Sequence, residues 1–146
     1  MGQVISIGKQ DYVSLRENHY FYIDKTDFIR QWWKNADDIT LITRPRRFGK
    51  TLNMSMLRSF FDLNGNHEIF RNLRITQEAE VCEEYMGKYP VISISLKGIN
   101  AQTYENALEM AVQIINGEAR KFQYLLEGNQ LTEYDKKAYI ALLQPQ

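Results

Sequence analysis

The chain has 146 residues, of which 44% are hydrophobic and 25% are charged, a composition that fits one globular domain and excludes a disordered chain. Eighteen basic side chains balance eighteen acidic ones, so the net charge gives no general attraction to nucleic acid or to an anionic membrane, and any anion site must be local. A single cysteine excludes an internal disulfide, and no apolar run approaches the roughly 18 residues of a membrane span, so we expect a reducing, cytoplasmic location and no membrane partner.

Residues 1–38 are expected to form an N-terminal lead-in segment that packs on the rest of the chain. Four apolar residues within it have the i, i+1, i+4, i+5 spacing of one helical face, namely Phe28, Ile29, Trp32 and Trp33. Thr26 is the expected N-cap of this helix. The sequence Asn-Ala-Asp-Asp at 35–38 ends the helix and turns the chain.

The hydrophobic period changes twice in the next thirty residues. Residues 39–43 (Ile-Thr-Leu-Ile-Thr) are a short β-branched run, which predicts a buried strand, and Pro45 blocks its extension. From Thr51 the apolar residues recur at helical spacing. This predicts a helix that ends at the stop signal Asn64-Gly65.

The second half of the chain continues the alternation of helix and strand. We expect a helix over 78–86, a strand over 90–96, a long helix capped by Thr103, and a last helix that starts at Thr132 with Asp135 three residues on. The order strand, helix, helix, strand, helix predicts an α/β fold with a parallel sheet flanked by helices and joined by right-handed crossovers.

A basic loop with one glycine lies between the first predicted strand and the helix that follows. Arg44 to Thr51 reads Arg-Pro-Arg-Arg-Phe-Gly-Lys-Thr. The first N–H groups of a helix have no intrahelical partner and carry about half a positive charge, so they attract phosphate oxygens. Gly49 lets the backbone approach a phosphate, Lys50 supplies an ammonium for the terminal phosphates, and the Thr51 hydroxyl suits Mg²⁺. The sequence therefore predicts a P-loop that binds ATP, or another nucleoside triphosphate, with Mg²⁺.

The predicted phosphate-binding residues are consecutive: Arg46, Arg47, Phe48, Gly49, Lys50, Thr51 and Leu52. Thr51 is also the predicted metal ligand, and no catalytic residue is assigned. The general P-loop motif starts with a glycine where this chain has Arg44, and we expect Pro45 to turn the chain there by fixing φ near −65°. One of the loop arginines is expected to bind phosphate bidentately, while exposed ion pairs remain an alternative for all three.

These residues resemble a known family. Tyr22-Ile23-Asp24-Lys25-Thr26, the loop with its following Leu-Asn-Met-Ser, and Tyr89 to Leu96 resemble the bacterial AAA-ATPase-like domain, a P-loop ATPase branch related to archaeal ATPases. The resemblance spans nearly the whole chain, and the loop is its most specific part. It implies an AAA-type fold and a loop that lacks the first glycine as a family trait. Proteins of this family often carry a PD-(D/E)XK nuclease-like domain C-terminal to the ATPase-like domain. The resemblance therefore also implies nucleic acid as a possible partner of such a domain.

The resemblance also implies an acidic strand, the Walker B strand, after a helix such as the one near Leu143. We therefore expect residues 39–146 to be a P-loop ATPase-like core that stops before this strand, within the N-terminal part of a longer protein. Asp24 ends an apolar run and is a weak candidate for the missing acid; its alternative role is to cap a turn. The aromatic residues before it could border adenine, but we favour a place in the core.

Three functions remain open on the sequence alone. The first is nucleotide binding, in a protein that is an ATPase when whole, with negligible turnover by this part. The second is binding of nucleic-acid phosphate through the loop arginines, which the neutral net charge disfavours. The third is an inactive P-loop module that self-associates or binds a protein partner.

Overall fold

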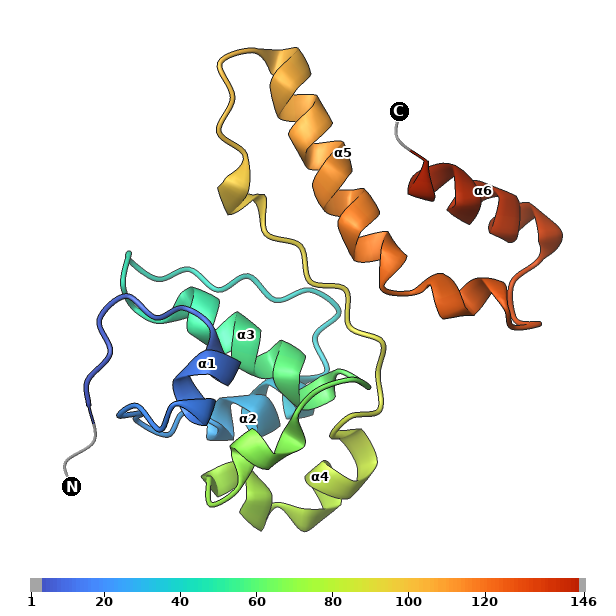
Figure 1. Cartoon of the computed structure of the whole chain (residues 1–146). Coiled ribbons are helices and arrows are strands. Elements are labelled where there is room, and N and C mark those ends of the chain that lie inside the picture. The colour runs from blue at the N-terminus through green and yellow to red at the C-terminus, as the bar shows by residue number, and fades with distance from the viewer. Residues whose placement is uncertain (1–3, 145–146) are drawn as a thin grey trace. The chain divides into compact units, whose positions relative to one another are not determined.

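The computed structural model describes residues 4–144 (Figure 1). Its elements in chain order are the α-helices and short 3₁₀ turns α1 (Tyr12–Glu17), α2 (Asp27–Asn35), α3 (Lys50–Phe61), η1 (His67–Phe70), η2 (Arg74–Gln77), α4 (Ala79–Tyr85), η3 (Leu96–Gly98), α5 (Tyr104–Arg120), η4 (Gln123–Leu126) and α6 (Glu133–Leu143). The chain divides into two compact units at residues 91 and 92, and each unit is described by itself.

The predicted parallel sheet is wrong, because the described residues contain no sheet. Residues 39–43 and 90–95 carry no regular secondary structure, and β-pairing is limited to one isolated parallel bridge between Asp62 and Tyr89. Ile39 and Leu41 are 89% and 83% exposed instead of buried. A β-branched run suits a pleated surface, but a strand also needs a neighbour for its N–H and C=O groups, and residues 4–144 give neither run that neighbour.

The first unit, up to Val91, has an aromatic and aliphatic core. The buried side chains come from α1, α2, α3 and the segment 69–75 that includes parts of η1 and η2: Tyr12, Leu15, Ile29, Met56, Leu57, Phe60, Phe61, Ile69, Phe70, Leu73 and Ile75. Phe60 lies at its centre, with ring centroids 5.1 Å from Phe61 and 5.4 Å from Phe70. Burying each such ring stabilises the fold by about 2 kcal/mol, so this cluster holds α3 in place.

Thr26 occupies the N-cap position of α2, as predicted, but its hydroxyl does not bond the first amides of the helix. It makes no side-chain cap bond, and instead donates to Asp24 Oδ1 at 2.6 Å and accepts from the Ile75 amide at 3.1 Å. Asp24 also accepts from the amides of Thr26, at 2.9 Å, and of Arg74, at 2.7 Å. These two side chains therefore fasten η2 to the start of α2 from fifty residues away in sequence.

Gly87 closes α4, as the sequence predicts, and its left-handed backbone (φ 69°) is needed there. A Cβ at this position would lie 2.4 Å from Cε1 of His67, and the Gly87 amide donates to the Phe60 carbonyl at 2.9 Å. The imidazole packs on the bare glycine, so the residue is fixed both by its conformation and by this close contact.

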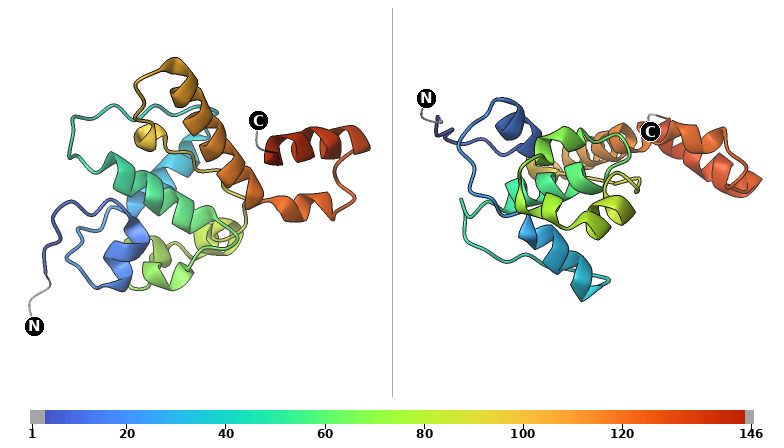
Figure 2. Two further views of the ribbon diagram at one scale, coloured as in Figure 1. Left: turned by 45° about the horizontal axis from the view of Figure 1, so that its top comes forward. Right: turned by 90° about the horizontal axis from the view of Figure 1, so that it is seen from below.

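The second unit, from Ile92, contains α5 and α6, which are joined through η4 (Figure 2). Both predicted caps are confirmed: the Thr103 hydroxyl accepts from the Asn106 amide, and Thr132 and Asp135 form a reciprocal capping box. Glu118 is the single buried residue between 92 and 144, so the described part of this unit buries no apolar side chain fully. In the part of the chain that is described, no helix has both the length and the hydropathy of a membrane span.

Candidate functional site

The loop from Arg44 to Gly49 makes a tight turn directly before α3. Arg46 and Arg47 form the turn, and two of its residues are left-handed, Arg47 with φ 69° and Gly49 with φ 76°. A Cβ on Gly49 would meet no atom within 4 Å, so glycine is favoured there by backbone conformation and leaves the space above it open. The turn therefore brings the chain into the start of the helix with no side chain hydrogen-bonded to its first amides.

The first amides of α3 are available to a ligand. Gly49 is the N-cap and no side chain caps it, and the first intrahelical bond at this end runs from the Asn53 amide to the Gly49 carbonyl at 2.9 Å. The amides of Lys50, Thr51 and Leu52 precede that bond. They point out of the end of a 12-residue helix, where the aligned peptide dipoles favour negative charge.

The Lys50 side chain folds back over the loop. Its ammonium donates a hydrogen bond to the backbone carbonyl of Arg44, six residues earlier. The ammonium is thus held on the loop that precedes α3, by a carbonyl for which a ligand anion could exchange. Thr51 is exposed in the first turn and Leu52 is half-buried against the core of the first unit.

The remaining predicted site residues are at the surface. Arg44, Arg46, Arg47 and Phe48 are all exposed, Phe48 by 60%, and none of the ion pairs in the described structure includes these arginines. The structure therefore brings the seven predicted residues together as one loop and helix start. The alternative of exposed ion pairs for the arginines finds no acidic partner among the described residues.

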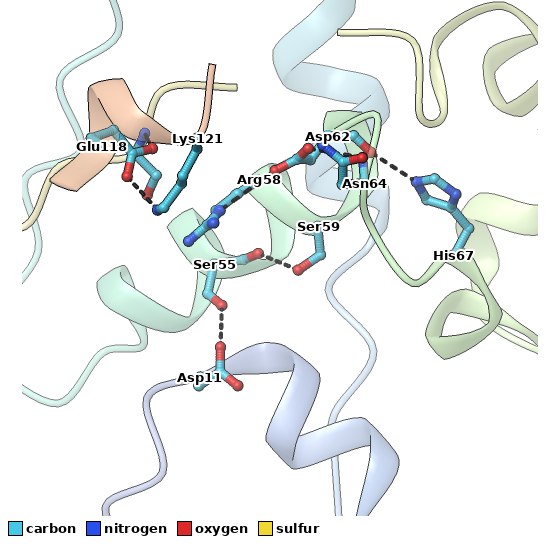
Figure 3. A network of polar contacts seen from close by, with 10 residues as sticks. Asp11, Ser55, Arg58, Ser59, Asp62, Asn64, His67, Glu118 and Lys121 are labelled. Carbon is cyan, nitrogen blue, oxygen red and sulfur yellow. Dashed lines mark hydrogen bonds and ion pairs between the residues drawn. The ribbon is translucent and has the colours of Figure 1, made fainter. Parts of the chain in front are cut away.

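The second turn of α3 is held by α1, which the sequence analysis missed (Figure 3). The Ser55 hydroxyl donates to Asp11 Oδ1 at 3.0 Å and accepts from the Tyr12 amide at 3.0 Å. Asp11 also caps α1 by accepting from the Ser14 amide at 2.8 Å. Asp11, an N-cap residue type directly before Tyr12, was a usable signal for the start of this helix. These bonds fix the helix whose first turn carries Lys50 and Thr51.

Acidic groups for a metal are few around this loop. No cluster of three or more His, Cys, Asp or Glu side chains that could hold an ion occurs in residues 4–144. The Asp24 carboxylate is occupied by the three hydrogen bonds from Thr26 and Arg74 described above. Burial raises the pKa of Asp24, but these hydrogen bonds outweigh it and hold the pKa below its usual value. They match the interpretation of Asp24 as a turn cap.

Comparison with known proteins gives the family. A family profile described as "Predicted AAA-ATPase", the AAA-ATPase-like family, matches residues 6–144, and the chain belongs to this family. No solved structure matches the chain significantly.

A relative among curated proteins is an "Uncharacterized protein in vnfD 5'region" of Azotobacter chroococcum mcd 1. It is 35% identical over 95 residues, which are 64% of this chain and 17% of the relative. The matched region is thus under a fifth of the relative's length, and the relative's name assigns no activity.

Proposed function

We propose that the loop 44–49 and the first turn of α3 form a P-loop that binds the phosphates of ATP. The observation that carries the proposal is the set of uncapped amides of Lys50, Thr51 and Leu52, together with the Lys50 ammonium that bonds the Arg44 carbonyl of the same loop. A triphosphate would accept from these donors at the positively polarised start of α3. Membership of the AAA-ATPase-like family supports a nucleotide as the ligand.

Each loop residue has a role in this proposal. The Lys50 ammonium leaves the Arg44 carbonyl and pairs with the terminal phosphates, and Gly49 leaves room for them. Arg46 or Arg47 reaches a phosphate oxygen bidentately from the exposed turn. Arg47 and Gly49 have left-handed backbones in the tight turn, and turns that include left-handed residues can direct successive amides toward an anion.

Mg²⁺ fits this site with Thr51 as its protein ligand. Magnesium keeps several waters and needs one or two protein oxygens besides phosphate, so an exposed hydroxyl in the first turn is sufficient and no acidic cluster is required to bind it. When bound, the ion would neutralise charge on the terminal phosphates. Hydrolysis further needs a group that orients water, and we assign this role to none of residues 4–144. We therefore propose that the whole protein is an ATPase and that this chain alone has negligible turnover.

Calorimetric titration of Mg-ATP into the chain tests the proposal. Lys50→Ala is expected to weaken binding by about tenfold or more, since one charge-assisted contact contributes about 1.5–3 kcal/mol. Lys137→Ala, at an exposed position of α6, is the matched control and should bind as the wild type does. Equal affinity of the Lys50 variant and the wild type would contradict the proposal.

Nucleic-acid binding is a second candidate, favoured by the exposure of three arginines and Phe48 on one turn. Guanidinium groups bind backbone phosphates and an exposed ring can stack on a base. Titration of a single-stranded oligonucleotide at several salt concentrations distinguishes the two functions. Affinity that falls steeply with salt and is unchanged by excess ATP would favour nucleic acid, while competition by ATP would favour the nucleotide site.

A further inference from the structure

Thr51 and Ser55 lie on one face of α3, four residues apart, in its first and second turns. Residues at this spacing are neighbours on a helix surface, with Cβ atoms about 5–6 Å apart. Helical side chains also lean toward the N-terminus, so Ser55 extends toward the turn that carries Thr51. A group that binds the Ser55 hydroxyl therefore lies beside the turn that carries the proposed magnesium ligand.

Asp11 is such a group, and it stands directly before α1. Its Oδ1 accepts from the Ser55 hydroxyl at 3.0 Å (Figure 3), and its Oδ2 accepts from the Ser14 amide at 2.8 Å. The same hydroxyl accepts from the Tyr12 amide at 3.0 Å, so the start of α1 is joined to the second turn of α3 by two hydrogen bonds. Both helices belong to the first unit, and these bonds give the carboxylate a defined place beside α3.

The Asp11 carboxylate can accept from a further partner. Its two oxygens offer about four acceptor positions, and the hydrogen bonds from Ser55 and Ser14 use two of them. The residue is exposed, and none of the ion pairs within residues 4–144 includes it. A carboxylate that is hydrogen-bonded in place and open to solvent is suited to a hydrated divalent cation.

Other carboxylates of the first unit do not have this position. Asp62 is the C-cap of α3, at the opposite end of the 12-residue helix and so about 18 Å from its start. Asp24 is occupied by Thr26 and Arg74 and has no hydrogen bond to α3 among the described residues. Asp11 is thus the acid of the first unit that a hydrogen bond joins to the first half of α3.

We propose that Asp11 is a positioning residue for the magnesium ion that accompanies the bound nucleotide, and that it accepts hydrogen bonds from the waters of that ion. This inference rests on the proposed P-loop. Magnesium keeps several waters and is usually bound through one or two carboxylates besides phosphate oxygens. Thr51 supplies a neutral hydroxyl, and Asp11 supplies a negative charge beside it. Ser55 orients the carboxylate, as outer-shell hydrogen bonds do around other metal sites.

Calorimetric titration of ATP into the full chain, once with Mg²⁺ and once with EDTA, tests the proposal. Asp11→Asn should weaken the binding of Mg-ATP by about tenfold, the usual scale for loss of an outer-shell partner of a metal. Its affinity for ATP in EDTA should equal that of the wild type. Asparagine keeps the size of the side chain and is a good N-cap, so α1 keeps its start. Glu17→Gln removes the same charge at the other end of α1 and is the matched control.

The ratio of the two affinities distinguishes a role toward the metal from a structural role. A damaged fold would weaken ATP binding equally with and without Mg²⁺, so equal losses would overturn the proposal. An Asp11→Asn variant that binds Mg-ATP as the wild type does would overturn it as well, while the P-loop would stand if Lys50→Ala still lost affinity. A wild-type chain that binds ATP in neither solution would overturn both the P-loop and the role of Asp11.

Discussion

The two units of the chain bury their apolar residues to very different degrees. Up to Val91, Phe60, Phe70 and their neighbours form a close-packed core, and long-range hydrogen bonds such as Thr26 to Ile75 tie the turns to the helices. From Ile92 to Gln144, helix caps and one buried carboxylate supply the contacts, and the apolar side chains remain partly exposed. Stability therefore comes from side-chain packing in the first unit and from local helix signals in the second.

The largest difference between the two units is expected when a large apolar side chain of each is truncated to alanine. Phe60 is fully buried, so Phe60→Ala is expected to lower the free energy of unfolding by about 3–5 kcal/mol. Leu108 of α5 is half exposed, and Leu108→Ala should cost under about 1 kcal/mol. Urea unfolding followed by circular dichroism measures both. Equal losses would mean that α5 lies in a packed core that the described structure does not show.

A smaller loss of stability is expected when the buried hydroxyl of Thr26 is removed. Thr26→Val keeps the shape of the side chain but leaves Ile75 N–H without an acceptor, at a cost of about 1–3 kcal/mol. Thr132→Ala removes an exposed helix cap in the second unit and should cost about 1 kcal/mol or less. The comparison uses the same urea unfolding. A Thr26 variant as stable as wild type would show that η2 is held by packing alone.

The pH dependence of stability gives the finest test of the first unit. The pKa of Asp24 is lower in the folded chain than its ordinary value of 3.8, because hydrogen bonds from Thr26 and Arg74 outweigh the effect of burial. The carboxylate therefore stabilises the fold above that value, and this contribution is lost as the pH falls through the lower, folded pKa.

Asp24→Asn should accordingly flatten the loss of stability between about pH 5 and about pH 2. The exposed Asp37→Asn is the control and should keep the wild-type slope. Unfolding curves recorded across this range measure the effect. A slope that Asp24→Asn leaves unchanged would show that its hydrogen bonds do not favour the ionised form.

Features set by neighbouring residues could be predicted from the sequence, and features set by distant contacts could not. The helices carried their own signals: Thr103 and the Thr132–Asp135 pair cap α5 and α6 as expected, and Gly49 precedes α3. The strands at 39–43 and 90–96 were wrong because pairing needs a distant partner that composition does not report. Short α1 was missed although Asp11 is a local N-cap signal, because six residues show little helical period and the helix is held by Ser55, forty-three residues away from Tyr12.

The candidate site was predictable in part for the same reason. A turn with glycine before a helix start is a local feature, and the loop 44–49 has it. The Lys50 bond to the Arg44 carbonyl and the Asp11–Ser55 contact could not be predicted, since they depend on how the loop folds back and on which helix lies beside α3.

The central claim is that the start of α3 binds phosphate, and the chemical shifts of the backbone amides at this helix start test it directly. ¹H–¹⁵N correlation spectra recorded during titration with Mg-ATP should show the largest shifts at Gly49, Lys50, Thr51 and Leu52. Lys50→Ala should reduce them at the same ligand concentration. Saturable shifts confined to other parts of the chain, with these four amides unmoved, would contradict the account.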